Sequence, residues 1–251
     1  MTPRHQSFGP PEAQPLLLGT SLGTDIGMWE GQIPLSEDLR LIAFTHREHG
    51  DSPAPPGPYE IGDLGADVLA LMDELGLERA SYCGTSLGGM VGMWLAANAP
   101  ERIDRLVLIC TAAHMPNASA YAERAIAVRQ EGSTESIADG VLEKWLTPAF
   151  AAAHSEVRAR LRSMLTASDP EGYAGCCEAI AAMDLRERLE AIAAPTLVIS
   201  GADDLATPAE LQEAVARAIA GARHEVVAPA AHLAAIEQAE RVNELIGEHL
   251  R

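Results

Sequence analysis

Three segments far apart in the sequence carry residue types that together can hydrolyse an ester. Ser86 is the centre of residues 84–88, a G-x-S-x-G pattern, Asp203 and Asp204 follow an apolar run, and His232 lies near the C-terminus. A serine hydroxyl becomes a nucleophile when a histidine accepts its proton, and a carboxylate holds that histidine in the required tautomer. These residues therefore indicate acyl transfer, provided that the fold brings them together.

The residues around Ser86 predict a strand, an abrupt turn and a helix. A short apolar run precedes the serine, and Gly84, Gly88 and Gly89 surround it. Such a turn forces its apex residue into an unfavourable conformation and needs small neighbours, because strand and helix then pack closely. The alternative is a glycine-rich turn with an incidental serine, and the pattern alone does not decide between them. The flanking elements must decide.

Short apolar runs bounded by turn residues predict strands that alternate with helices. Strands are expected at 16–18, 39–44, 80–85, 106–110, 195–200 and 224–227, with helices at 61–75, 90–95, 208–219 and 233–250. This alternation predicts an α/β fold with a mostly parallel sheet wound by helices. Residues 116–188 show no strand pattern, so we expect a helical cap there and a core made of residues 1–115 and 189–251.

Ser86, the aspartate pair and His232 each follow a predicted strand. In an open parallel sheet, ligands bind beyond the carboxyl ends of the strands. Their order along the chain, serine, acid and histidine, is that of the α/β-hydrolases. Asp204 is the preferred acid because it lies deeper in its loop, and Asp203 is the competitor, with helix capping as its other role.

His232 is preferred as the base because it lies in the loop after the last predicted strand, at the mouth of the expected site. A lone histidine is more often a satisfied polar residue than a catalyst. The rival histidines are His46, His49, His114, His154 and His224. The pair His46 and His49 suggests a metal, but no further ligands occur at a suitable spacing, so we expect neither metal nor cofactor.

Composition excludes several classes of partner. The chain of 251 residues has a formal charge of −18, which disfavours nucleic acid and anionic membranes. Four cysteines without C-x-x-C spacing and the absence of a membrane-length apolar run indicate a cytoplasmic protein with free thiols. A small molecule is the expected partner.

Several longer motifs together resemble the 3-oxoadipate enol-lactonase family of α/β-hydrolases. They are residues 16–25 (LLLGTSLGTD), Met28-Trp29, the serine turn, 143–148 (EKWLTP), 172–174 (GYA) and 201–208 (GADDLATP). The resemblance extends from Leu16 through the expected cap. It implies hydrolysis of 3-oxoadipate enol-lactone to 3-oxoadipate, a step of the β-ketoadipate pathway in bacterial breakdown of protocatechuate and catechol.

The resemblance also implies roles for individual residues. Ser86 becomes the nucleophile, Asp204 the acid and His232 the base, while the backbone N–H groups of Leu22 and Leu87 form the oxyanion hole. The alternatives are an esterase, lactonase or C–C hydrolase with another substrate, and a non-catalytic member of the fold that only binds a ligand.

The substrate that this resemblance implies is an acid, and its carboxylate needs a cation in a protein of this charge. Arg124 and Arg129 in the cap are the candidates, and Trp145 is a candidate apolar wall. Surface arginines and a core tryptophan are the alternative interpretation.

Two segments depart from the family pattern. The stretch before Leu16 is short, so the first strand or hairpin of the fold is expected to be reduced or missing. Residues 45–50 (THREHG) resemble D-x-R-G-H-G with Thr45 and Glu48 substituted. This loop is expected to support the site from outside, so that catalysis survives the substitutions.

Overall fold

A computed structural model of the protein describes residues 1–47, 49, 52 and 55–251. Within these residues seven strands form one sheet in the order β1-β3-β2-β4-β5-β6-β7. The strands are β1 (His5–Phe8), β2 (Gln14–Gly19), β3 (Leu39–Phe44), β4 (Ala80–Thr85), β5 (Ile103–Ile109), β6 (Thr196–Gly201) and β7 (Arg223–Val227). All neighbouring pairs are parallel except β1 with β3, which is antiparallel. The predicted α/β fold with a mostly parallel sheet is therefore confirmed.

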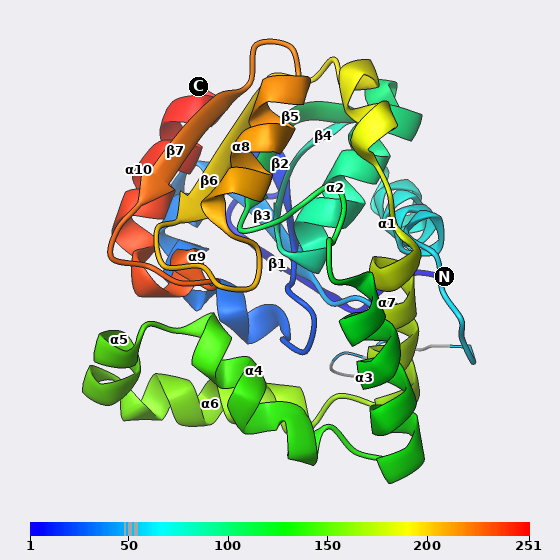
Figure 1. Ribbon diagram of the computed structural model, residues 1–251. Helices are drawn as coiled ribbons and strands as arrows, with labels where there is room; N and C mark the ends of the chain where they lie inside the picture. Colours follow the sequence, from blue (N-terminus) through cyan, green and yellow to red (C-terminus); the bar gives the residue numbers. More distant parts are fainter. Residues whose placement is uncertain (48, 50–51, 53–54) are drawn as a thin grey trace.

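Helices cover both faces of the sheet (Figure 1). η1 (Ile26–Glu37), α9 (Ala234–Glu237) and α10 (Ala239–Leu250) contact one another, whereas α1 (Ile61–Glu74) contacts α2 (Leu87–Asn98), which packs on β4 and β5, and α8 (Ala209–Ala218) packs on β6 and β7. The central strands are buried on both sides, and every residue of β4 and β6 is buried. This double burial explains why the sequences of these strands do not alternate regularly between apolar and polar residues.

The predicted strands and helices are present, with ends shifted by a few residues. β1 was not predicted from the sequence because four partly exposed residues, HQSF, carry no apolar pattern. The strand expected before β2 to be reduced or missing is thus present, with four residues, at the edge of the sheet. The expected helix 233–250 is divided into α9 and α10, since Gln238 leaves the helical conformation, with φ −129° and ψ 49°.

Residues between β5 and β6 form helices, and no strand lies among them in the described chain. The helices are α3 (Ala118–Glu131), α4 (Ala138–Trp145), α5 (Pro148–Ala153), α6 (Ser155–Thr166) and α7 (Pro170–Ala182), with the short 3-10 turns η3 (Glu135–Ile137) and η4 (Arg186–Ala191); a further 3-10 turn, η2 (Pro100–Arg102), precedes β5. We call residues 118–182 the cap. α3 and α7 lie side by side, and α4 packs against α6 (Figure 1). The boundaries 116–188 stay a prediction.

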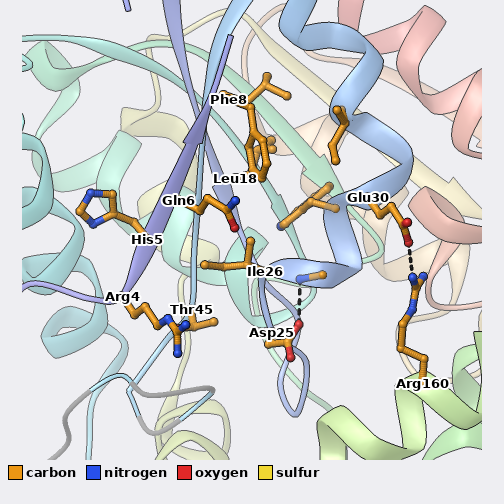
Figure 2. Close-up of a pocket in the computed structure, with 14 residues that line it drawn as sticks. Arg4, His5, Gln6, Phe8, Leu18, Asp25, Ile26, Glu30, Thr45 and Arg160 are labelled. Atoms are coloured by element: carbon orange, nitrogen blue, oxygen red, sulfur yellow. Dashed lines mark hydrogen bonds and ion pairs between the residues drawn. The ribbon is translucent and has the colours of Figure 1, made fainter.

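A hollow of about 650 Å³ lies at the β1 edge of the sheet, between this strand, η1 and α6. Figure 2 shows Phe8 and Leu18 on one side of it and the ion pair between Glu30 and Arg160 on the other. None of its lining residues belongs to the serine, acid and histidine set, so we assign it no part in the chemistry. None of the helices in the described residues is both long and apolar enough to span a membrane.

Candidate active site

Ser86 stands at the turn between β4 and α2 with a φ of 55°, a conformation that few residues other than glycine adopt. The close approach of strand and helix holds it there. A Cβ on Gly84 would lie 2.3 Å from the carbonyl carbon of Gly88, and a Cβ on Gly88 would lie 2.3 Å from the oxygen of Gly19. Both glycines are therefore required by contact distance, as the sequence predicted.

Backbone contacts to the neighbouring strand fix the turn further. The Ser86 N–H donates to the carbonyl of Ile109 at 2.9 Å, and the Thr111 hydroxyl donates to the Ser86 carbonyl at 2.7 Å. The strain at Ser86 is thus offset by bonds on both sides of the residue. The backbone of the turn therefore holds the Ser86 hydroxyl in a fixed position.

Asp204 lies against His232, beyond the ends of β6 and β7. The Nδ1 atom of His232 lies 2.9 Å from Oδ2 and 3.1 Å from Oδ1 of Asp204. The carboxylate also accepts bonds from the N–H groups of Ala206 and Thr207 at 2.8 and 2.9 Å, and from the Thr207 hydroxyl at 2.7 Å. These donors order the carboxylate before any substrate binds.

The charge state of Asp204 follows from these contacts. Burial disfavours the charged form, but His232 and the bonds from Thr207 outweigh burial and lower the pKa of the carboxyl below its usual value. An ionised carboxylate accepts a hydrogen bond from Nδ1–H of His232. In that tautomer Nε2 carries no proton and can accept a hydrogen bond. Asp203, the competing acid, is exposed.

Ser86 and His232 line one cavity beneath the cap. Three more of the predicted site residues line it, namely Leu22, Arg124 and Trp145. The remaining lining residues are Ser21, Asn117, Ala120, Tyr121, Val141, Lys144, Tyr173, Ile180, Leu205 and Ala206. Core and cap therefore build this cavity jointly.

Arg124 carries a positive charge into this cavity. Its guanidinium carbon lies 5.1 Å from the centre of the Tyr121 ring, a cation–π distance. Among the residues that the structure describes, no aspartate or glutamate forms an ion pair with it. The guanidinium is also hydrogen-bonded to Tyr173, so its positive charge is not neutralised by a carboxylate of the described chain.

The structure does not bring Arg129 to the cavity. Its guanidinium forms ion pairs with Glu171, at 2.8 Å, and with Glu178, both on α7. Arg129 follows Arg124 by five residues, which on an α-helix turns the side chain by roughly 140°. The two arginines of α3 therefore face different surroundings, and Arg129 joins α3 to α7.

The two backbone N–H groups expected to form an oxyanion hole belong to Leu22 and Leu87. Leu87 is the first residue of α2, so its N–H has no carbonyl within its own helix to bond. Leu22 lies in the loop after β2, which the Gly88 N–H anchors by donating to the Thr20 carbonyl at 3.1 Å. The two segments that carry these donors are thereby joined.

Two buried histidines support the Leu22 loop from behind. His46 Nε2 donates to the Thr20 carbonyl at 3.1 Å, and His49 Nε2 accepts the Gly23 N–H at 2.7 Å. His49 Nδ1 donates to the Arg47 carbonyl at 2.9 Å, which fixes its neutral tautomer.

Burial keeps both rings uncharged. Desolvation, with the neighbouring His49, lowers the pKa of His46 to about 3, and desolvation also lowers the pKa of His49. The 45–50 loop, which was predicted to support the site from outside, thus contacts the Leu22 loop through His46 and His49. Glu48 and Gly50 of the same motif lie outside the described residues.

Residues 14–239 match the family model of the alpha/beta hydrolase fold. The chain is 38% identical to 3-oxoadipate enol-lactonase 2 of Acinetobacter baylyi over 96% of this chain and 90% of that protein. It is 32% identical to 3-oxoadipate enol-lactonase 1 of the same organism over 94% and 88%. The crystal structure of the enol-lactonase from Burkholderia xenovorans superposes with a TM-score of 0.96 at 40% identity, covering 98% and 95%. The chain belongs to the 3-oxoadipate enol-lactonase family of α/β-hydrolases.

In this α/β-hydrolase the rival histidines have other partners. His224 bonds Ser200 at 2.7 Å, His154 packs on Phe150, and His114 forms a backbone bridge outside the sheet. None of them lines the cavity of Ser86.

Sequence reasoning missed three residues of this enol-lactonase family site: Lys144, Tyr173 and Thr207. The first two line the cavity, and the Thr207 hydroxyl donates to the Asp204 carboxylate. Each lies inside a motif that supports the family resemblance, so motif membership is the signal that pointed to them. The motifs gave no side-chain direction, and for that reason no role could be assigned.

Proposed function

We propose that this protein hydrolyses 3-oxoadipate enol-lactone to 3-oxoadipate, with Ser86, His232 and Asp204 as its catalytic triad. One observation carries the proposal: the cavity of Ser86 and His232 also holds Arg124, a cation without a carboxylate partner in the described chain. An anionic acyl substrate matches both features, and relatives named as enol-lactonases support the choice.

The reaction begins when Ser86 Oγ attacks the lactone carbonyl and His232 Nε2 accepts the hydroxyl proton. Asp204 stabilises the resulting imidazolium without itself taking the proton. The N–H groups of Leu22 and Leu87 bond the oxyanion, where a single donor is worth about 3 kcal/mol.

Collapse of this intermediate breaks the ring C–O bond. The leaving enol oxygen takes the proton from His232, and the enol then converts to the ketone of the product. Water gives its proton to His232 and attacks the acyl ester on Ser86. The second tetrahedral intermediate expels Ser86 Oγ, which recovers its proton from His232.

Arg124 binds the carboxylate of the substrate in this proposal, and Lys144 and Trp145 form part of the same wall. A protein of charge −18 repels an anion at long range, so binding needs a local cation. A charge-assisted hydrogen bond contributes about 1.5–3 kcal/mol, and Arg124 supplies it where Arg129, held by two glutamates, does not.

The proposed partner is the small-molecule lactone, with no nucleic acid and no membrane. We place the enzyme in the cytoplasm, since none of the four cysteines, all of them in the described chain, forms a disulfide bond.

The test is a spectrophotometric assay with 3-oxoadipate enol-lactone. Ser86→Ala should abolish turnover while circular dichroism stays that of the wild type. Arg124→Gln should raise KM for the lactone about 10- to 100-fold and leave hydrolysis of a neutral p-nitrophenyl ester unchanged. Arg129→Gln is the matched control and should leave both substrates near wild-type values.

Substantial lactonase activity in Ser86→Ala contradicts the catalytic assignment. An unchanged KM in Arg124→Gln contradicts the carboxylate assignment. Preference of the wild type for neutral esters over the anionic lactone contradicts the proposed substrate.

A further inference from the structure

Glu237 of α9 is a buried carboxylate with no ion-pair partner among the described residues. Its exposed fraction is 8%. Oε1 accepts the Ala231 N–H at 2.7 Å, while Oε2 accepts the Thr147 N–H at 3.0 Å and the Thr147 hydroxyl at 2.6 Å. Burial of an unpaired carboxylate is costly unless hydrogen bonds compensate it, so these bonds are the reason it is tolerated.

The partners of Glu237 come from two segments of the active site. Ala231 directly precedes His232, and Thr147 follows the end of α4, the helix of Trp145. A further bond joins the same segments, because the Leu233 N–H donates to the Trp145 carbonyl at 2.9 Å. The residues on both sides of the base are therefore tied to the cap segment that forms the cavity wall.

We propose that Glu237 is a positioning residue that holds the His232 backbone in register with the Trp145 segment of the cap. The inference rests on the proposed function, since it takes His232 as the base and Trp145 as part of the substrate wall. Glu237 does not line the cavity and acts through the backbone on either side of these residues.

The chemistry of three converging donors favours a carboxylate at this position. A carboxylate offers only acceptors, whereas an amide of the same shape places an NH₂ group against one of the donors. Glu237→Gln therefore keeps the side-chain volume but removes the hydrogen bonds on one side, either to Ala231 or to Thr147. Glu240 on α10 is exposed and has no hydrogen bond or ion pair in the described chain, so Glu240→Gln removes the same charge as a matched control.

The experiment measures two rates on the full chain at a temperature well below unfolding. One is kcat with the enol-lactone, and the other is the rate at which a neutral phosphonate labels Ser86, which needs His232 but no substrate carboxylate. Glu237→Gln should lower both about 10-fold or more, while Glu240→Gln should leave both at wild-type values.

A spectroscopic measurement separates positioning from support of the fold. The proton of His232 Nδ1–H bonded to Asp204 should give a low-field NMR signal in the wild type and in Glu240→Gln. It should shift or broaden in Glu237→Gln. Both rates within twofold of the wild type, with an unchanged signal, overturn the proposal even where the melting temperature falls.

Thr147→Val decides the question if Glu237→Gln does not fold. It removes the hydroxyl that bonds Glu237, which also caps α5. At least a threefold loss in the labelling rate supports the proposal, and no loss overturns it. A wild type that labels with phosphonate but ignores the lactone refutes the proposed substrate alone, whereas a wild type that does not label refutes both.

Discussion

Acidification should destabilise the protein through His46, the buried histidine behind the Leu22 loop. In the folded chain burial lowers its pKa to about 3, against 6.5 for an ordinary histidine. Below pH 6.5 the His46 ring binds a proton in the unfolded chain but stays neutral in the folded chain. Stability is therefore lost as the pH falls through 6.5, and the loss continues down to about pH 3.

The size of this effect follows from the two pKa values. Between about pH 7.5 and about pH 5 the folded ring stays neutral while the unfolded ring becomes nearly fully charged, which costs about 2 kcal/mol. His49 adds to the loss in the same direction, because its pKa is also lowered.

The assay is urea unfolding at both pH values, followed by circular dichroism, for the wild type and for His46→Gln. A glutamine amide can still donate to the Thr20 carbonyl but does not titrate. The difference in stability between the two pH values should be about 2 kcal/mol larger in the wild type. His154→Gln changes an exposed histidine and should behave as the wild type does.

This double difference removes the background of carboxylates, which titrate alike in both proteins. Equal pH dependence in the wild type and in His46→Gln would refute the reasoning. It would mean that the folded protein accepts the proton on His46 at no cost.

Two further predictions concern packing. Gly88→Ala should lower stability by about 1–3 kcal/mol and slow phosphonate labelling of Ser86, because its Cβ would lie 2.3 Å from the oxygen of Gly19. The control Gly140→Ala meets no atom within 4 Å and should raise the melting temperature, since alanine favours a helix. All four cysteines are buried, and burial raises the pKa of the Cys177 thiol to about 12. Iodoacetamide should therefore leave the native protein unlabelled and modify all four thiols in urea, as mass spectrometry would show.

The sequence predicted the strands that carry the chemistry because they are buried on both faces. Apolar runs such as Leu16–Leu18 can be read without knowledge of their neighbours. β1 could not be predicted, because its residues are held by pairing with β3 rather than by burial. The break between α9 and α10 at Gln238 was also not predicted. Apolar residues continue at helical spacing across it, so the sequence pattern shows one helix.

In the candidate site, too, some residues could be predicted from the sequence and others could not. Ser86, Asp204 and His232 could be chosen because strand ends in a parallel sheet point to one edge. The sequence did not separate Arg124 from Arg129, since both lie on one helix and only the glutamates of α7 distinguish them. Glu237 was not noticed at all, because its partners are backbone groups that no motif records.

The cap leaves the sheet after β5 and returns at β6, which are neighbours in the sheet. An excursion between adjacent strands can change in length and sequence at little cost in loop-closure entropy, and it does not alter the register of the core. Exchange of caps between relatives is therefore a practical route to new substrates. Such an exchange has one condition, which is that the incoming segment must present a donor pair to Glu237 where Thr147 now stands.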